Sequence, residues 1–189
     1  MRHILLLSLL FSSAVYGQKR LIRETSSEII TTAYALQEKS EYEKAIEEYS
    51  KVSVNDTNYA VARYEMGTCY LELEQFDNAK KEFDIAVTKK PAMGTTAEGY
   101  YWSARIYSGL HKDPVKNPTA FADLKKNLTN YISIQPTFDL AKEHGQDPFF
   151  DVYIQSFKDG ASGFNTKSWK EAADNFATAV TFSDIIYSN

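Results

Sequence analysis

Apolar and small side chains recur three and four residues apart along much of this chain, the spacing that places them on one face of an α-helix. Between residues 42 and 52 the pattern is carried by Tyr42, Ala45, Ile46, Tyr49 and Val52. A shift of 34 residues superposes like on like: Tyr42 on Phe76, Ala45 on Ala79, Tyr49 on Phe83 and Val52 on Ala86. A helical pattern repeated at this period predicts an all-α array of helix pairs.

The second copy of the period, residues 60–93, orders small and large residues as a helical hairpin requires. We expect Gly67 and Ala79 to face each other where the two helices cross, because only small side chains let the backbones approach closely. Pro91 is expected to end the second helix, since proline has no N–H to donate. Larger side chains are expected to fill the space on either side of the crossing: Tyr70, Phe76 and Phe83.

This order of residues resembles the tetratricopeptide repeat (TPR) family. The second copy carries the resemblance at Tyr64, Met66, Gly67, Tyr70, Phe76, Ala79, Phe83, Ala86 and Pro91. The resemblance implies a right-handed α-solenoid of about four TPR-like helix hairpins. The predicted units are residues 26–59, 60–93, 97–137 and 149–184.

The other three copies match less strictly than the second. A capping box of Thr25 and Glu28 is expected to start the first copy. The third copy is degenerate, with a polar loop at residues 111–118 between its helices. The fourth copy keeps the offsets of the second, with a turn at residues 165–167: Gly160, Trp169, Ala172, Phe176 and Ala179.

The end of the sequence suggests an array that continues. Ser183 is expected to cap a further helix, truncated over residues 185–189. A solenoid normally ends in a helix with a polar outer face, yet Phe176, Val180 and Phe182 have no evident cover. The sequence therefore reads as an N-terminal fragment of a longer array, the alternative being that this end packs on a partner.

The first residues have the pattern of an export signal. A basic start precedes an apolar run from Ile4 to Phe11, and small residues precede the predicted cleavage site before Gln18. An uncleaved anchor is the weaker alternative, because a membrane span needs roughly 20 apolar residues, and no cysteine follows for a lipid anchor. We predict a signal peptide at residues 1–17, a mature N-terminal segment at 18–25, and export to the periplasm or the medium.

Composition argues against most kinds of chemistry. With 25 acidic and 21 basic residues the formal charge is −4, so nucleic acid is not an expected partner. The single cysteine, Cys69, has no disulfide partner and reads as a small core residue. His3, His111 and His144 do not fall at the spacing of metal ligands, so no metal, cofactor or enzymatic activity is expected.

The resemblance also implies a binding groove, because the first helix of each TPR pair lines a concave face. At the family's contact offsets this sequence has Ile30 and Ser108 and the principal candidates Tyr34, Glu38, Tyr64, Thr68, Glu72, Tyr101 and Arg105. Chaperone-binding TPRs clamp a terminal carboxylate with Lys, Arg and Asn at these offsets. This sequence has Ile30, Tyr34, Tyr64 and Thr68 instead, so carboxylate clamping is not expected. The alternative for Tyr34 and Tyr64 is that they pack between hairpins.

These features favour a non-catalytic scaffold of the bacterial cell envelope that binds a protein or peptide in the groove. Two alternatives remain open. One is a glycan or cell-wall-binding module, in which Tyr100, Tyr101 and Trp102 would be exposed and stack on sugar rings. The other is an accessory domain of an enzyme encoded beyond residue 189.

Overall fold

The computed structural model describes residues 25–187, and over that range the chain is all-helical, with no strand. The predicted all-α fold is confirmed. The predicted signal peptide and residues 18–24 of the mature N-terminal segment lie outside the described residues. The elements are α1 (Ser26–Gln37), α2 (Tyr42–Ser50), α3 (Tyr59–Glu72), α4 (Phe76–Lys89), a 3₁₀ helix (Pro91–Thr95), α5 (Ala97–Leu110), α6 (Ala120–Ile134), α7 (Asp139–His144), α8 (Asp147–Asn165) and α9 (Trp169–Tyr187).

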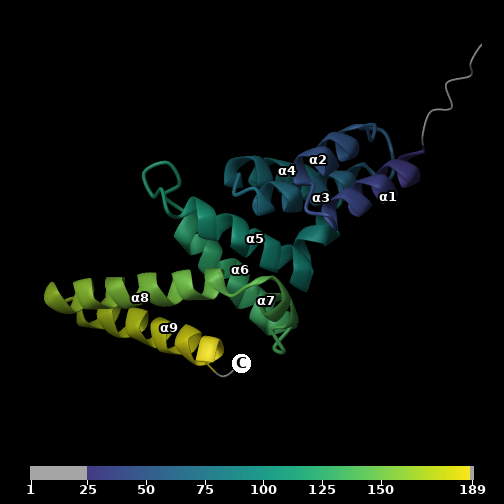
Figure 1. Cartoon of the computed structure of the whole chain (residues 1–189). Coiled ribbons are helices and arrows are strands. Elements are labelled where there is room, and N and C mark those ends of the chain that lie inside the picture. The colour runs from purple at the N-terminus through teal and green to yellow at the C-terminus, as the bar shows by residue number, and fades with distance from the viewer. Residues whose placement is uncertain (1–24, 188–189) are drawn as a thin grey trace, which may run out of the picture.

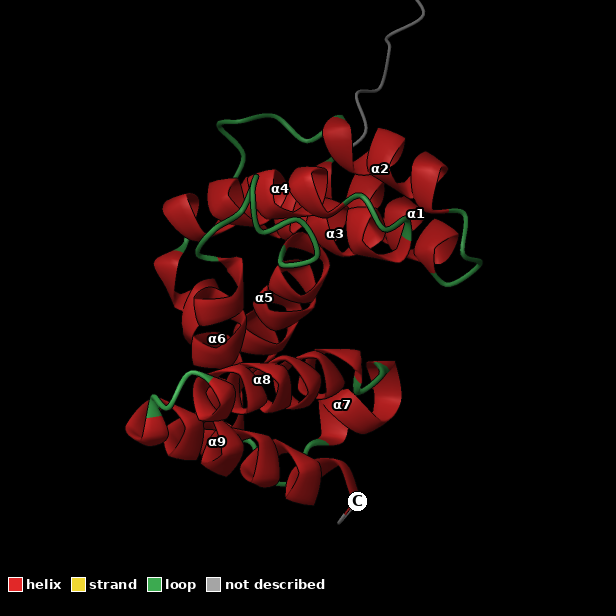
Figure 2. Cartoon of the chain, turned by 90° about the vertical axis from the view of Figure 1, so that its left-hand side faces the viewer, coloured by secondary structure: helices red, strands yellow, loops and turns green. Residues whose placement is uncertain are grey.

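Helices that follow one another pack as pairs: α1 with α2, α3 with α4, α5 with α6, and α8 with α9. Successive pairs then lie against each other, α2 on α3, α4 on α5, and α8 on both α5 and α6. Figure 1 shows the pairs in order from purple to yellow, with α5 and α6 in the middle of the stack. Figure 2 shows the same stack from the side, with α8 and α9 at the end opposite α1 and α2.

Three of the four pairs share one turn. Ser40, Glu74 and Lys167 take left-handed backbone conformations, with φ of 59°, 55° and 62°. In each case the next residue donates its N–H to the carbonyl five residues back, as in the Schellman motif that ends many helices. The three bonds are Glu41 N to Leu36 O (2.9 Å), Gln75 N to Tyr70 O (2.8 Å) and Ser168 N to Gly163 O (2.8 Å).

The third pair lacks that turn. Its helices α5 and α6 are separated by residues 111–119, so the predicted polar loop is confirmed. Lys116 Nζ lies 2.6 Å from Asp77 Oδ2 on α4, which ties the loop to the preceding pair.

The predicted close approach inside the second hairpin is also confirmed. A Cβ placed on Gly67 would lie 3.3 Å from the carbonyl oxygen of Ala79 and 2.2 Å from Cδ2 of Phe83. Helix α4 ends at Lys89, two residues before Pro91, as expected. The capping box at the start of α1 is present as well, with Glu28 N donating to Thr25 Oγ1 (3.3 Å) and Thr25 N to Glu28 Oε2 (2.8 Å).

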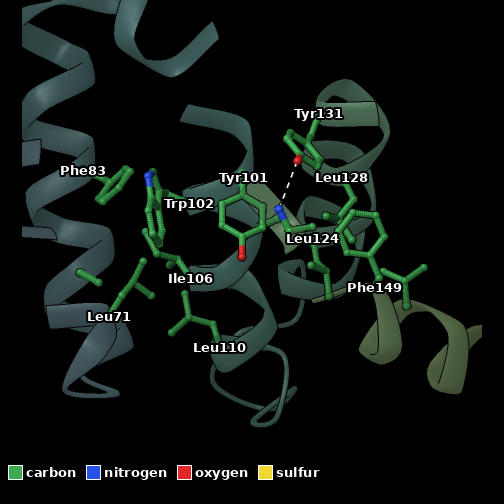
Figure 3. Close-up of a cluster of buried hydrophobic side chains, with 14 of the residues drawn as sticks. Leu71, Phe83, Tyr101, Trp102, Ile106, Leu110, Leu124, Leu128, Tyr131 and Phe149 are labelled. Atoms are coloured by element: carbon green, nitrogen blue, oxygen red, sulfur yellow. Dashed lines mark hydrogen bonds between the residues drawn. The ribbon is translucent and has the colours of Figure 1, made fainter. Parts of the chain in front are cut away.

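The core runs continuously from α3 to α9, and α5 occupies its centre. Figure 3 shows the side chains of α5 between Leu71 and Phe83 on one side and α6 on the other, with Phe149 of α8 beyond. A second cluster, including the fully buried Cys69, fills the space between the first pair and α3. Burial of Cys69 as a core residue is thus confirmed.

Two parts of the chain differ from the sequence-based expectation. Helix α7 was not expected, and it is held by Ala141 N, which donates to the Tyr131 hydroxyl at 3.3 Å (Figure 3). Ser183 does not start a further helix: α9 continues through Tyr187, and residues 188 and 189 lie outside the described range. Phe182, expected to lack cover, is instead 4% exposed and packs against Phe149 with ring centroids 6.0 Å apart.

Candidate functional site

The first helices of three successive pairs, α1, α3 and α5, surround a hollow of about 490 Å³ that α7 closes on one side. We call it the acidic hollow. It is lined by Tyr34, Gln37, Glu38, Tyr42, Glu65, Thr68, Glu72, Glu98, Trp102, Arg105, Glu143 and His144. Five of the predicted groove residues are in this lining: Tyr34, Glu38, Thr68, Glu72 and Arg105.

The other two principal candidates, Tyr64 and Tyr101, are buried and do not line the hollow. Tyr64 is 4% exposed and stacks on Phe83 with ring centroids 4.5 Å apart. Tyr101 is fully buried, and its hydroxyl donates to the carbonyl of Gly145 at 2.8 Å. Large rings at these positions fill the interior of the stack, where burial of their area stabilises the fold.

Two further expectations are corrected by the same packing. Ile30 is buried in the core between the first pair and α3. Ser108 is buried too, and its hydroxyl donates to Asp151 of α8. Trp102 and Tyr101 are buried and Tyr100 is half-buried, so the exposed stacking surface expected for a glycan module is absent at these residues.

Residues next to the buried tyrosines line the hollow in their place. Glu65 follows Tyr64 and Trp102 follows Tyr101, which turns each side chain about 100° around its helix. Glu65, Thr68 and Glu72 recur three and four residues apart, so this polar stripe was detectable in the sequence. Glu143 and His144 were not detectable, because they come from the unexpected α7.

A hydrogen-bond chain fixes one wall of the hollow. The Tyr34 hydroxyl donates to Glu65 Oε1 (2.9 Å), which joins α1 to α3. Gln37 Nε2 donates to Thr68 Oγ1 (3.0 Å), while Gln37 Oε1 accepts from the Tyr49 hydroxyl of α2 (2.6 Å). Side chains held by such a chain are already oriented before a ligand arrives.

The opposite wall is built around Trp102. Its Nε1 donates to Glu98 Oε1 at 3.4 Å, and its ring lies 4.9 Å from that of His144 between centroids. The Arg105 guanidinium stands 5.2 Å from the centre of the Trp102 ring and pairs with Glu72 Oε1 at 2.7 Å. This side of the hollow thus holds a cation against an aromatic ring and a carboxylate.

Burial makes the floor of the hollow electrostatically unusual. It raises the pKa of Glu65, and the charge of Glu98 raises it further, against hydrogen bonds that lower it. Burial also raises the pKa of Cys69, to about 12, with contributions from Glu65 and Glu72. At neutral pH the thiol is therefore protonated and unreactive.

A second polar cluster joins α5 to α8. Asp151 accepts from Ser108, and His111 Nε2 lies 3.4 Å from Asp151 Oδ2. Burial alone would raise the pKa of Asp151, but the adjacent His111 and the hydrogen bond from Ser108 hold it below its usual value. The cluster acts as a polar link between two pairs.

Residues 25–187 contain no group of three or more His, Cys, Asp or Glu side chains arranged to hold a metal ion. Over the same residues, no helix combines the length and the apolar character that crossing a membrane would require. Comparison of the chain with protein-family models, with curated proteins and with solved structures gives no match.

Proposed function

We propose that this protein is a non-catalytic interaction scaffold that binds a segment of a partner protein in the acidic hollow. The observation that carries the proposal is that α1, α3 and α5 all contribute side chains to one concave surface. Repeated use of equivalent helices gives an extended chain several contacts in register. The exposed ring of Tyr34 there offers contact area at low entropic cost.

The architecture we propose is a right-handed TPR-like solenoid of about four hairpins. Two observations support it beyond the sequence resemblance. Ser40 and Glu74 lie one period of 34 residues apart. Both take the left-handed backbone conformation, and the residue after each donates the same backbone hydrogen bond. Gly67 and Ala79 meet at the helix crossing, where the family has small residues.

We also propose that the protein acts outside the cytoplasm, in the periplasm or the medium. The support is the sequence pattern of residues 1–17, with its basic start and apolar run. N-terminal sequencing of the protein recovered from cells would identify Gln18 as the first residue. A protein that retains Met1 would contradict this.

The binding proposal is tested by selecting a displayed library of unstructured peptides on the purified protein and measuring affinities by fluorescence anisotropy. The informative variant is Tyr34→Ala, since Tyr34 is 40% exposed and lines the hollow. Loss of one aromatic contact is expected to weaken binding about tenfold. Tyr187→Ala is the matched control, because Tyr187 is 74% exposed and does not line the hollow.

Equal binding by Tyr34→Ala and the unaltered protein would show that the hollow is not the binding site. Tyr64→Ala and Tyr101→Ala are unsuitable for this test. Both rings are buried, so their removal would lower the stability of the fold as well as any affinity.

A further inference from the structure

The acidic hollow carries an excess of negative charge that its own residues do not neutralise. Its lining has five glutamates against one arginine, a formal charge of −4 with His144 neutral. Glu72 is paired with Arg105, and Glu143 has only the neighbouring His144 at 3.8 Å. Glu38, Glu65 and Glu98 form no ion pair within residues 25–187.

The residue before Glu65, Tyr64, has a buried hydroxyl without a hydrogen-bond partner. The Tyr64 side chain is 4% exposed, and its hydroxyl forms no hydrogen bond. Burial raises the pKa of Tyr64 most, and the charges of Glu98 and Glu65 raise it further. The two carboxylates thus leave negative charge uncompensated both in the hollow and in the core beside it, and a cation bound between them would offset that charge.

We infer that the partner segment is basic, and that a lysine or arginine side chain of that segment enters the hollow between Glu65 and Glu98. The inference rests on the proposed function. The two carboxylates line the hollow and offer acceptors for an ammonium or guanidinium group, which has donors only.

The hollow already displays this kind of recognition with one of its own residues. Arg105 lies against the Trp102 ring and pairs with Glu72, which is the contact set that a cationic side chain prefers. Neither Glu65 nor Glu98 pairs with such a cation within the described chain. An incoming basic side chain would therefore restore charge balance, whereas an acidic segment would meet repulsion.

The test compares three versions of each library-selected peptide: as selected, with every Lys and Arg replaced by Gln, and with every Lys and Arg replaced by Glu. The selected peptides are expected to be enriched in Lys and Arg. Neutralisation is expected to weaken binding about tenfold and the acidic version to show no binding. Binding of the basic version should also weaken as salt is raised.

Protein variants locate the effect. Glu98→Gln keeps an acceptor for Trp102 and is expected to weaken basic peptides severalfold while leaving the Gln versions unchanged. Glu38→Gln is expected to act in the same direction. Glu47→Gln is the matched control, because Glu47 is exposed on α2 and does not line the hollow.

The outcomes separate two kinds of failure. If the Gln versions bind as tightly as the basic ones and Tyr34→Ala still weakens both, the hollow binds peptides but the inference of a basic partner is wrong. If Tyr34→Ala and the glutamate variants leave every affinity unchanged, the proposed site fails together with the inference.

Discussion

The hairpins α3–α4 and α8–α9 have the same order of small and large residues, but their aromatic side chains are buried to different extents. Gly67 faces Phe83 in one hairpin, and Gly160 faces Phe176 in the other, with a Cβ on Gly160 lying 2.7 Å from Phe176 Cδ1. Yet Phe83 is 4% exposed, whereas Phe176 is only half-buried. The order of small and large residues inside a hairpin therefore determines how its two helices cross, but it does not determine how deeply the aromatic rings are buried.

Burial is set by the next hairpin along the stack. Phe76, the first residue of α4, is covered by α5, where Gly109 is so close that an added Cβ would lie 2.2 Å from the ring. Trp169 begins α9 at the equivalent place and is 57% exposed. Val180, farther along α9, is 59% exposed, so the lack of cover expected for it is confirmed within the described chain.

The largest expected difference between the two hairpins comes from removing the ring. Phe83→Ala is expected to lower the free energy of unfolding by about 3–5 kcal/mol, because the cavity lies within the packed stack. Phe176→Ala is expected to cost about 1 kcal/mol, since much of that ring already contacts water. Urea unfolding followed by circular dichroism measures both. Equal losses would show that α9 is as well covered as α4, and that the contrast is wrong.

Adding a methyl group at the crossing gives a smaller difference. Gly67→Ala is expected to destabilise the fold by about 1–3 kcal/mol, because Phe83 is enclosed and the carbonyl of Ala79 cannot move away. At Gly160 the half-exposed Phe176 ring can turn toward solvent, and alanine favours a helix over glycine by about 1 kcal/mol. Gly160→Ala is therefore expected to leave the melting temperature nearly unchanged. A drop as large as that of Gly67→Ala would indicate that the Phe176 ring is held in place.

Much of the fold was accessible from the sequence because it depends on local and hairpin-level rules. Three predicted features each act within a few residues or one helix pair: Gly67 against Ala79 at the crossing, Pro91 after α4 and the capping box at Thr25. The turns were less accessible. Ser40, Glu74 and Lys167 adopt left-handed backbone conformations that usually favour glycine, so residue type alone does not predict them.

The residues that line the hollow were predictable from the sequence to within one helical position. Thr68 and Glu72 line the hollow, but α3 and α5 are oriented so that Tyr64 and Tyr101 enter the core and Glu65 and Trp102 line the hollow. The contacts that decide this rotation, such as the Tyr101 hydroxyl on Gly145, join residues far apart in sequence. Such contacts cannot be predicted from the sequence of a single 34-residue repeat.

The two hairpins also differ in the burial of their carboxylates, Glu65 in α3 and Asp174 in α9. Burial and the charge of Glu98 raise the pKa of Glu65, so ionisation disfavours the folded state, and stability is lost as pH rises through the raised pKa. Glu65→Gln removes that penalty and is expected to stabilise the fold by about 1 kcal/mol at neutral pH, with little gain at pH 4. Melting temperatures of both proteins across that pH range measure the effect.

The control for Glu65→Gln is Asp174→Asn in α9. Asp174 pairs with Lys170 at 2.7 Å, but both side chains are largely in solvent. The substitution is therefore expected to leave the stability unchanged at either pH. If Glu65→Gln proves destabilising at neutral pH, the hydrogen bond that Glu65 accepts from Tyr34 outweighs the cost of burying its charge.

The smallest expected effect is one that the two hairpins share. Glu74→Gly and Lys167→Gly should each stabilise the fold by about 0.5–1 kcal/mol, because glycine adopts positive φ without the clash that a Cβ causes. The gain should be alike in both hairpins, since the turn is closed by its own backbone hydrogen bond and not by a neighbouring pair. Urea unfolding measures the two gains side by side. A gain in stability at Glu74 without one at Lys167 would mean that packing by the neighbouring helix pair influences the turns as well as the rings.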